Sequence, residues 1–245
     1  MVTPSTLLRA SYNASKEFFR PPAEEHALKA PAAPHVQPVM VPIRSLGPSH
    51  GERIATHLLA LNEHDRYLRF GYSASDEQIR RYVDGLNFER DEIFGIYNRK
   101  LQLIAMAHLA HTTDPNLRSC AEFGVSVLAQ ARGRGYGARL FDRAVMHARN
   151  NGVDMMFIHA LSENTAMLNI ARKAGAIIER DGSESEAYLK LPPADLDSRM
   201  TEMVEEQIAQ TDYRLKVQAK QFWDMLALVQ EVRQGVRDGR DRMPM

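Results

Sequence analysis

Hydrophobic positions between Val39 and Leu191 recur with two spacings, and the order of these spacings predicts the order of the secondary structure. Steps of three and four residues are typical of amphipathic helices, and short runs rich in β-branched and aromatic residues are typical of strands. The predicted order is β-α-α-β-β-β-α-β-α-β-β. The helices are predicted at 54–61, 75–86, 136–148 and 164–175, and the strands at 39–43, 92–97, 101–109, 121–128, 154–161, 176–179 and 186–191.

Local signals indicate where some of these elements begin and end. Ser75 and Gln78 have the spacing of a capping box at the start of the second helix. Residues 98–100 form a plausible turn between two strands, and Gly175 stops the last of the four helices.

The segments on either side of this region have different patterns. Residues 1–38 are rich in Pro and Ala without a sustained period, which predicts a flexible N-terminal arm. Beyond Pro193, apolar positions alternate in steps of four and three, the heptad spacing of helices that pair. The predicted organisation is an arm at 1–38, one domain at 39–193 and a helical extension at 194–245. The heptad positions are Val204, Ile208, Thr211, Leu215, Gln218, Phe222, Met225, Val229, Val232 and Val236.

The length of the C-terminal helix favours assembly. About 40 helical residues span about 60 Å, which is too long for one small domain to cover. We therefore expect a homo-oligomer formed through this helix; the alternative is an amphipathic helix that lies on its own domain. Thr211 and Gln218 at core positions favour a shallow, partly wet seam.

Composition and charge exclude several classes of function. The 245 residues contain 31 basic and 31 acidic side chains, so the net charge is zero and we expect no nucleic-acid partner. No apolar run approaches the roughly 20 residues that a membrane span needs, so we expect no membrane partner. Cys120 is the single cysteine, and no secretory signal pattern begins the chain, which favours a cytoplasmic protein.

The stretch ARGRGYGARLF, residues 131–141, carries the chemistry that the sequence shows most clearly. It follows a predicted strand and begins a predicted helix, and a helix N-terminus offers unpaired N–H groups to phosphates. Glycines let a ligand approach this backbone closely, and Arg132, Arg134 and Arg139 add positive charge. A Walker loop is excluded because no Gly-Lys-Ser/Thr follows, and the preceding hairpins argue against a dinucleotide-binding unit.

Two motifs resemble those of the GNAT acetyltransferase superfamily. VSVLAQARGRGYGARLF resembles its acyl-CoA-binding signature, with Arg132, Gly135 and Gly137 at matching positions. HALSENTAMLNIARKAGA resembles its fifth strand and following helix, with Asn164 and Gly175 matching. The resemblance covers about 39–191 and is nearest to bacterial protein-lysine acetyltransferase domains. It implies an α+β GNAT fold with a central mixed, mostly antiparallel sheet, helices on both faces and, outside the family domain, the long C-terminal helix.

The resemblance also implies a cosubstrate, acetyl-CoA, and the residues that bind it. Backbone amides of the glycine stretch would hold the pyrophosphate, and the strand before it would pair with the pantetheine arm. It implies no metal site. The residues expected to bind the cosubstrate are Val125, Val127, Arg132, Gly133, Arg134, Gly135, Tyr136, Gly137, Ala138 and Asn164.

Acetyl transfer to an amine needs a base, because an amine with a pKa near 10 is mostly protonated at neutral pH. By resemblance the candidate bases are Glu122, on the fourth strand, and His159, at the end of the fifth. Regular alternation puts Glu122 on the same strand face as Gly124 and Ser126, opposite Phe123.

The acid that protonates the departing thiolate is less clear. In many members of the family it is a tyrosine, whose place falls here on Ala171; Tyr72, Tyr188 and Ser126 are possible substitutes. The N–H of Val125 would be the oxyanion donor, and Gly124 would permit a bulge there. The missing tyrosine leaves open an acyl-CoA-binding sensor or scaffold with little turnover.

The amine acceptor is a small molecule or a protein. By resemblance, residues 68–82 line the acceptor entrance, and their charges have no dominant sign. The sequence therefore does not choose among a small amine, an antibiotic, an amino acid and a protein terminus.

Overall fold

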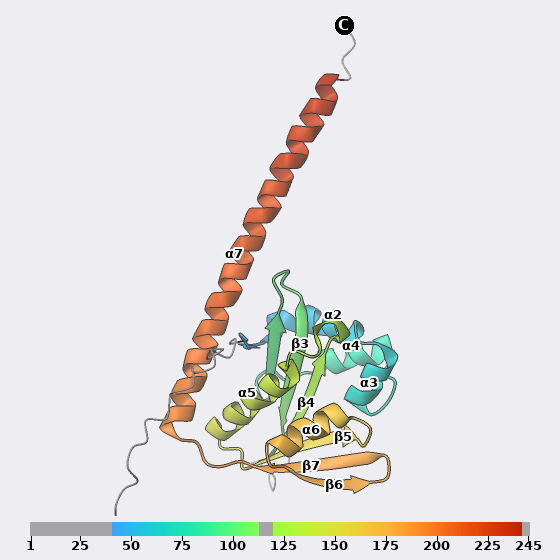
Figure 1. Ribbon diagram of the computed structural model, residues 1–245, viewed down its shortest axis with the longest axis vertical. Coiled ribbons are helices and arrows are strands. Elements are labelled where there is room, and N and C mark those ends of the chain that lie inside the picture. Colours follow the sequence, from blue (N-terminus) through green and yellow to red (C-terminus); the bar gives the residue numbers. More distant parts are fainter. Residues whose placement is uncertain (1–40, 113–119, 242–245) are drawn as a thin grey trace, which may run out of the picture. The chain divides into compact units, whose positions relative to one another are not determined.

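The computed structural model describes residues 41–112 and 120–241, with side chains up to residue 227. The predicted N-terminal arm and the first two residues of the predicted strand 39–43 lie outside the described residues. The elements that follow carry the labels of Figure 1.

Within the described residues, seven strands form one sheet in the order β1-β2-β3-β4-β5-β7-β6 (Figure 1). Neighbouring strands are antiparallel except β4 and β5, which are parallel. The predicted central mixed, mostly antiparallel sheet is therefore confirmed. The strands are β1 Arg44–Ser45, β2 Glu92–Tyr97, β3 Leu103–His111, β4 Cys120–Val127, β5 Met155–Leu161, β6 Ile177–Asp181 and β7 Glu184–Lys190.

Helices cover both faces of the sheet, as predicted. The side chains of β4 alternate between the faces: Phe123 stacks edge-on against Phe141 of α5, with ring centroids 5.1 Å apart, whereas Ser126 hydrogen-bonds to His57 of α2. α2, α3 and α4 thus lie on one face, and α5 lies beside α6 on the other (Figure 1). The bounds are α2 Gly51–Leu59, α3 Glu63–Phe70, α4 Asp76–Asp84, α5 Tyr136–Asn150 and α6 Thr165–Lys173, with short 3-10 turns η1 Pro48–His50 and η3 Ala129–Ala131.

The local signals in the sequence hold where a side chain or a glycine sets the boundary. The Ser75 side chain accepts from the Gln78 N–H and the Gln78 side chain accepts from the Ser75 N–H, so the capping box starts α4 as predicted. Gly175, just past the end of α6, has φ of 86°, a left-handed conformation that favours glycine.

Three predictions about the elements are wrong. The first strand is not 39–43, because the described part of that segment is irregular and β1 is the two-residue strand that follows it. A third helix, α3, stands between the two predicted ones; its largely polar sequence, EHDRYLRF, hides it from a search for apolar periodicity. β3 begins at Leu103 instead of residue 101, because Leu101 has φ of 60° and belongs to the turn closed by Asn98.

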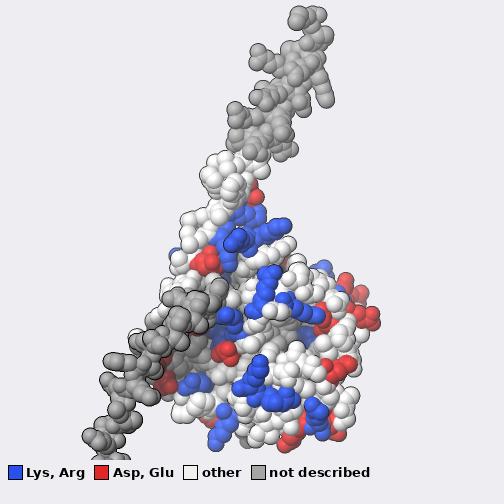
Figure 2. Space-filling view, in the orientation of Figure 1, with Lys and Arg blue, Asp and Glu red and all other residues white. Residues whose placement is uncertain are grey.

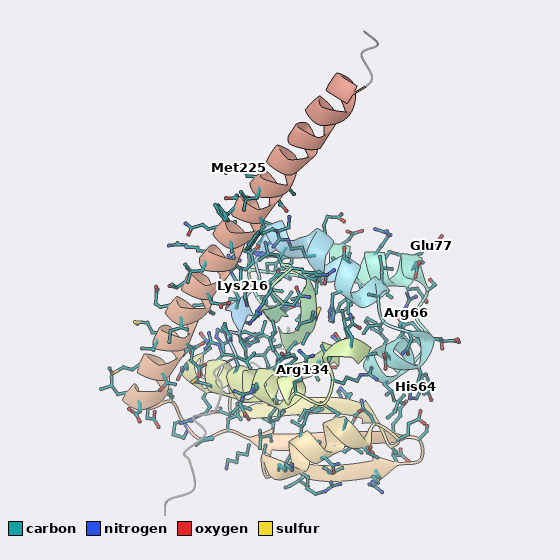
Figure 3. All side chains as sticks on the ribbon, turned by 45° about the horizontal axis from the view of Figure 1, so that its top comes forward. His64, Arg66, Glu77, Arg134, Lys216 and Met225 are labelled. Atoms are coloured by element: carbon teal, nitrogen blue, oxygen red, sulfur yellow. The ribbon has the colours of Figure 1, made fainter. Side chains whose placement is uncertain are left out.

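The C-terminal extension forms one helix, α7 Leu196–Asp241, as predicted. One of its faces contacts the domain: Glu202 and Glu206 pair with the buried Arg143 of α5, at 3.0 and 3.2 Å. Farther along, Lys216 Nζ donates to the Tyr97 carbonyl oxygen at 3.1 Å (Figure 3). The heptad positions belong to a different face, and six of their described side chains are exposed: Val204, Thr211, Leu215, Gln218, Phe222 and Met225.

Surface charge agrees with the balanced composition. Basic and acidic side chains are interspersed over the face that Figure 2 shows, with acidic ones gathered along its right edge, the side on which α3 and α4 lie in Figure 1. In the part of the chain that the structure describes, no helix is both long and apolar enough to cross a membrane.

Candidate active site

A cavity opens where β4 and β5 separate. The two strands pair over three positions only, from Cys120↔Met155 to Glu122↔Phe157, and beyond Glu122 the edge of β4 that faces β5 has no ladder partner. The space between the strands belongs to a cavity of about 730 Å³, which is in the usual range for a small-molecule site. Every predicted site residue except Arg134 borders it: Glu122, Val125, Val127, Arg132, Gly133, Gly135, Tyr136, Gly137, Ala138, His159 and Asn164.

No bulge causes this separation. β3 and β4 stay in continuous register from Ala105↔Val127 to His111↔Ala121. The bulge that Gly124 would permit is therefore not present, and the strands separate because β5 diverges from β4. The loss of pairing leaves backbone polar groups of β4 available to a ligand.

One end of the cavity is formed by the glycine loop and the first turn of α5. Gly133 and Gly135 have φ of 75° and 74°, so a side chain at either position would be strained. Gly135 is also the N-cap of α5 and provides no side-chain cap, which leaves the N–H groups of the first turn to a ligand. Gly137 allows close packing, because a Cβ there would lie 3.3 Å from Ile170 Cδ1 of α6.

The predicted cosubstrate residues with polar side chains differ in what they contact. Arg132 forms an ion pair with the buried carboxylate of Asp65 on α3, and its Nε donates to the Val127 carbonyl oxygen at 3.3 Å. Asn164 caps α6 by accepting from the Met167 N–H at 3.1 Å. Arg134, on the loop before α5, is exposed and does not border the cavity (Figure 3). The ion pair between Arg132 and Asp65 therefore holds the glycine loop against α3.

The two candidate bases lie in contact at the other end of the cavity. His159 Nδ1 is 3.3 Å from Glu122 Oε1, although the two residues come from different strands. His159 Nε2 is 3.2 Å from Glu186 Oε1 on β7, the residue directly opposite in the β5–β7 ladder. The imidazole thus stands between two carboxylates, and all three side chains are about half exposed. This arrangement can accept a proton and pass it to solvent.

Of the candidate acids for the thiolate, Ser126 alone borders the cavity. Tyr72 lies outside it, against Phe70. The hydroxyl of Tyr188 donates to Glu186, which raises the pKa of Tyr188 to about 12 and lowers the pKa of Glu186. The Tyr188 proton is therefore held by Glu186, and Tyr188 itself does not border the cavity.

Helix α6 brings no hydroxyl group to the cavity. Ala171, where the family tyrosine was expected, is fully buried in the core and does not border the cavity. The α6 positions that do border it are Ala166, Met167 and Ile170. Helix α6 therefore has no tyrosine at the cavity, and the neighbouring residue that borders the cavity is Ile170 instead of Ala171.

A series of hydrogen-bonded polar side chains behind β4 was not predicted from the sequence. Arg69 on α3 donates from Nη2 to the Tyr82 hydroxyl at 3.0 Å, and that hydroxyl lies 2.7 Å from His108 Nδ1. His108 Nε2 lies 3.2 Å from Asp91. Burial and the Arg69 charge lower the pKa of His108, so its imidazole is neutral at pH 7. The two partners of His108, Tyr82 and Asp91, come from α4 and from the segment before β2. No local sequence motif therefore predicts this series of hydrogen bonds.

A family model described as an acetyltransferase (GNAT) domain matches residues 41–177, more than half of the chain. The chain therefore belongs to the GNAT acetyltransferases and is an acyltransferase, which confirms the resemblance seen in the sequence. The GNAT domain of S. lividans PAT is 19% identical, with a TM-score of 0.52 over 61% of this chain and 89% of that one. A GNAT-family acetyltransferase from Streptococcus pneumoniae is 11% identical, with a TM-score of 0.51 over 62% and 100%. These structures share the fold, and no curated protein matches the chain.

Proposed function

We propose that the protein is an N-acetyltransferase that moves an acetyl group from acetyl-CoA to a primary amine by direct attack within a ternary complex. The observation that supports this most is one cavity with complementary ends. Its glycine loop and helix N-terminus suit a pyrophosphate, and the carboxylate and imidazole at the other end suit an amine.

The groups that bind the cosubstrate in this proposal are mostly backbone. The N–H groups of residues 133–138 hold the pyrophosphate, and the free edge of β4 at Val125 and Val127 pairs with the pantetheine arm. The N–H of Val125 faces the acyl oxygen as its charge develops. Arg134 supplies positive charge from outside the cavity, and the Asn164 side chain helps to orient the arm from the start of α6.

In the reaction, the amine first loses a proton to Glu122 or, through it, to His159. The neutral nitrogen then bonds to the acyl carbon, and the bond between that carbon and the CoA sulfur breaks. The electron pair leaves with sulfur, the bonded nitrogen releases its second proton to solvent, and the thiolate, whose thiol has a pKa near 8.5, takes a proton from solvent. No protein nucleophile is needed.

The test is the rate of acetyl-CoA turnover with a panel of primary amines, in wild type and in Glu122→Gln. We expect kcat/KM to fall roughly 100-fold or more, the usual contribution of a general base. Glu186→Gln is the matched control: it removes an equally exposed carboxylate from the other nitrogen of His159 and should change the rate only a few-fold. Wild-type rates in Glu122→Gln would exclude Glu122 as the base, and His159→Gln would then identify or exclude the histidine.

A sensor that binds acyl-CoA without turnover is the second candidate. The apolar α6 positions at the cavity favour it, because they bring no proton donor to the thiolate. Turnover of any amine at more than the rate of spontaneous hydrolysis would exclude this alternative.

We also propose that α7 joins two copies of the chain along its heptad face. The side chains that contact the domain, Glu202, Glu206 and Lys216, lie on the opposite side of the helix from Leu215 and the other heptad positions. We expect Leu215→Glu to halve the mass measured by light scattering, and Lys220→Glu, away from the heptad face, to leave it unchanged. An unchanged mass in both would place any assembly elsewhere.

Two further expectations stay predictions: the domain boundaries, 1–38, 39–193 and 194–245, and the cytoplasmic location.

A further inference from the structure

Arg69 reaches the cavity from α3 and lies against β4. Its guanidinium carbon is 2.7 Å from the point where a Cβ on Gly124 would be, so the glycine makes room for it. Gly124 shares its strand face with Glu122, two residues earlier. The guanidinium therefore stands beside the base on the same side of the sheet, and both border the cavity.

The charge of Arg69 has no carboxylate partner within the described residues, where the Tyr82 hydroxyl is its hydrogen-bond partner. Its neighbours on the chain and in the cavity behave differently: Arg66 pairs with Asp76 at 2.7 Å, and Arg132 pairs with Asp65. A guanidinium has five N–H donors in a planar fork that fits a carboxylate. The remaining donors of Arg69 thus suit an anionic group in the cavity.

Several contacts hold the guanidinium in this place. Arg69 lies over the rings of Phe70 and Tyr82, at 5.1 and 5.7 Å from their centroids. Because His108 is neutral with its Nε2 proton directed to Asp91, its Nδ1 accepts from the Tyr82 hydroxyl, whose oxygen then accepts from Arg69. Each hydrogen bond from Arg69 through Tyr82 and His108 to Asp91 therefore has one donor and one acceptor. The side chain is thus oriented before any ligand binds.

The distance between Arg69 and the base limits the size of the ligand. The strand positions of Glu122 and Gly124 are about 7 Å apart, and the guanidinium carbon lies 2.7 Å from the Cβ position of Gly124. In an α-amino acid the nitrogen and the carboxylate oxygens are about 3 Å apart, so with a hydrogen bond of about 2.9 Å at each end it spans about 9 Å. The ε-amine of a free lysine lies much farther from its own carboxylate.

We propose that Arg69 binds the carboxylate of the acceptor and that the acceptor is a free α-amino acid, acetylated on its α-amine. This inference rests on the proposed acetyltransferase function and specifies its substrate class. The cation binds the carboxylate while Glu122 and His159 receive the proton of the adjacent amine. Both charges of the amino acid are then matched across the cavity.

The experiment compares free amino acids with the corresponding α-carboxamides, for example leucine with leucinamide, as acceptors of the acetyl group. Each pair keeps the side chain and the primary amine and replaces the carboxylate by a neutral amide, which also lowers the pKa of the amine and therefore acts against the expected preference. We expect wild type to prefer the acid by at least 10-fold in kcat/KM. Arg69→Gln should lower kcat/KM for the acid roughly 10- to 100-fold, mainly through KM, because one charged hydrogen-bonded contact is lost. The same variant should leave the amide within a few-fold of wild type.

Two further variants separate the loss of this contact from a general loss of structure. Arg99→Gln removes the same charge from an exposed position in the turn between β2 and β3, away from the cavity, and should keep the preference for the acid. Gly124→Ala keeps Arg69 but puts a Cβ where its guanidinium lies, so it should also reduce the preference. Equal use of acid and amide by wild type, or an equal loss for both in Arg69→Gln, would overturn the inference. If polyamines or lysine peptides are acetylated but amino acids are not, the inference fails and the proposed function stands; if no amine is acetylated, the proposed function itself fails.

Discussion

His57 gives a stability prediction that depends on one buried side chain. It lies on α2 with 1% of its surface exposed. Its Nδ1 is 2.9 Å from the Leu103 carbonyl oxygen, so this nitrogen carries the proton, and its Nε2 accepts from the Ser126 hydroxyl at 2.8 Å. Burial lowers the pKa of His57 to about 4, and the nearby Arg69 charge acts in the same direction. Protonation would bury a charge and break the hydrogen bond from Ser126.

The pKa difference sets the size and the sign of the effect. In the unfolded chain the pKa of a histidine is about 6.5, so below that pH the unfolded state takes up a proton that the folded state refuses. The stabilisation is fully present above about pH 7 and is lost as the pH falls from 6.5 toward 4. Between pH 7.5 and pH 5, this one group lowers the free energy of unfolding by about 2 kcal/mol.

The assay is urea unfolding of wild type and His57→Gln at pH 7.5 and at pH 5. We expect the variant to be less stable at both pH values, but its loss between them should be smaller than that of wild type by about 2 kcal/mol. His64→Gln is the control, because His64 is exposed on α3 and the loss should match wild type (Figure 3). Equal losses in wild type and His57→Gln would refute the assignment of a depressed pKa to this residue.

Two other substitutions test the packing of α7 on the domain and of the core beside β2. Glu202→Gln removes a carboxylate that accepts from His147 at 2.6 Å and pairs with Arg143. We therefore expect the free energy of unfolding, measured by thermal unfolding, to fall by roughly 1 to 3 kcal/mol. A wild-type melting temperature would show that this contact of α7 adds no stability. Gly95→Ala puts a Cβ 2.7 Å from a methyl carbon of Leu103, so overpacking should cost about 1 to 3 kcal/mol in urea unfolding, and no loss would mean that the core can relax.

The sequence was most informative where a structure depends on neighbouring residues. The start of α4 follows from Ser75 and Gln78, because the capping box joins residues three apart. The glycine loop was predictable because glycine readily adopts the left-handed conformation that Gly133 and Gly135 have ahead of α5. The face of β4 that carries Glu122 follows from the strict alternation of a strand.

Features that depend on the order of strands in the sheet were not predictable. Glu186 lies opposite His159 because β7, not β6, pairs with β5, and no local pattern encodes that order. Arg69 belongs to α3, a helix with too few apolar residues to be recognised, and its role depends on a glycine about 55 residues later in the chain. The extent of the cavity follows from where β5 leaves β4, which the sequence does not mark.

The most direct test of the account is calorimetric titration of acetyl-CoA into wild type and Gly135→Asp. The substitution puts a carboxylate at the N-cap of α5, where the pyrophosphate is proposed to bind, and strains a backbone with φ of 74°. Gly152→Asp is matched in strain, with φ of 76°, and lies beyond the other end of α5. We expect wild type and Gly152→Asp to bind acetyl-CoA and Gly135→Asp not to bind it. Absence of binding to folded wild type, or equal binding to all three proteins, would exclude the proposed cosubstrate site.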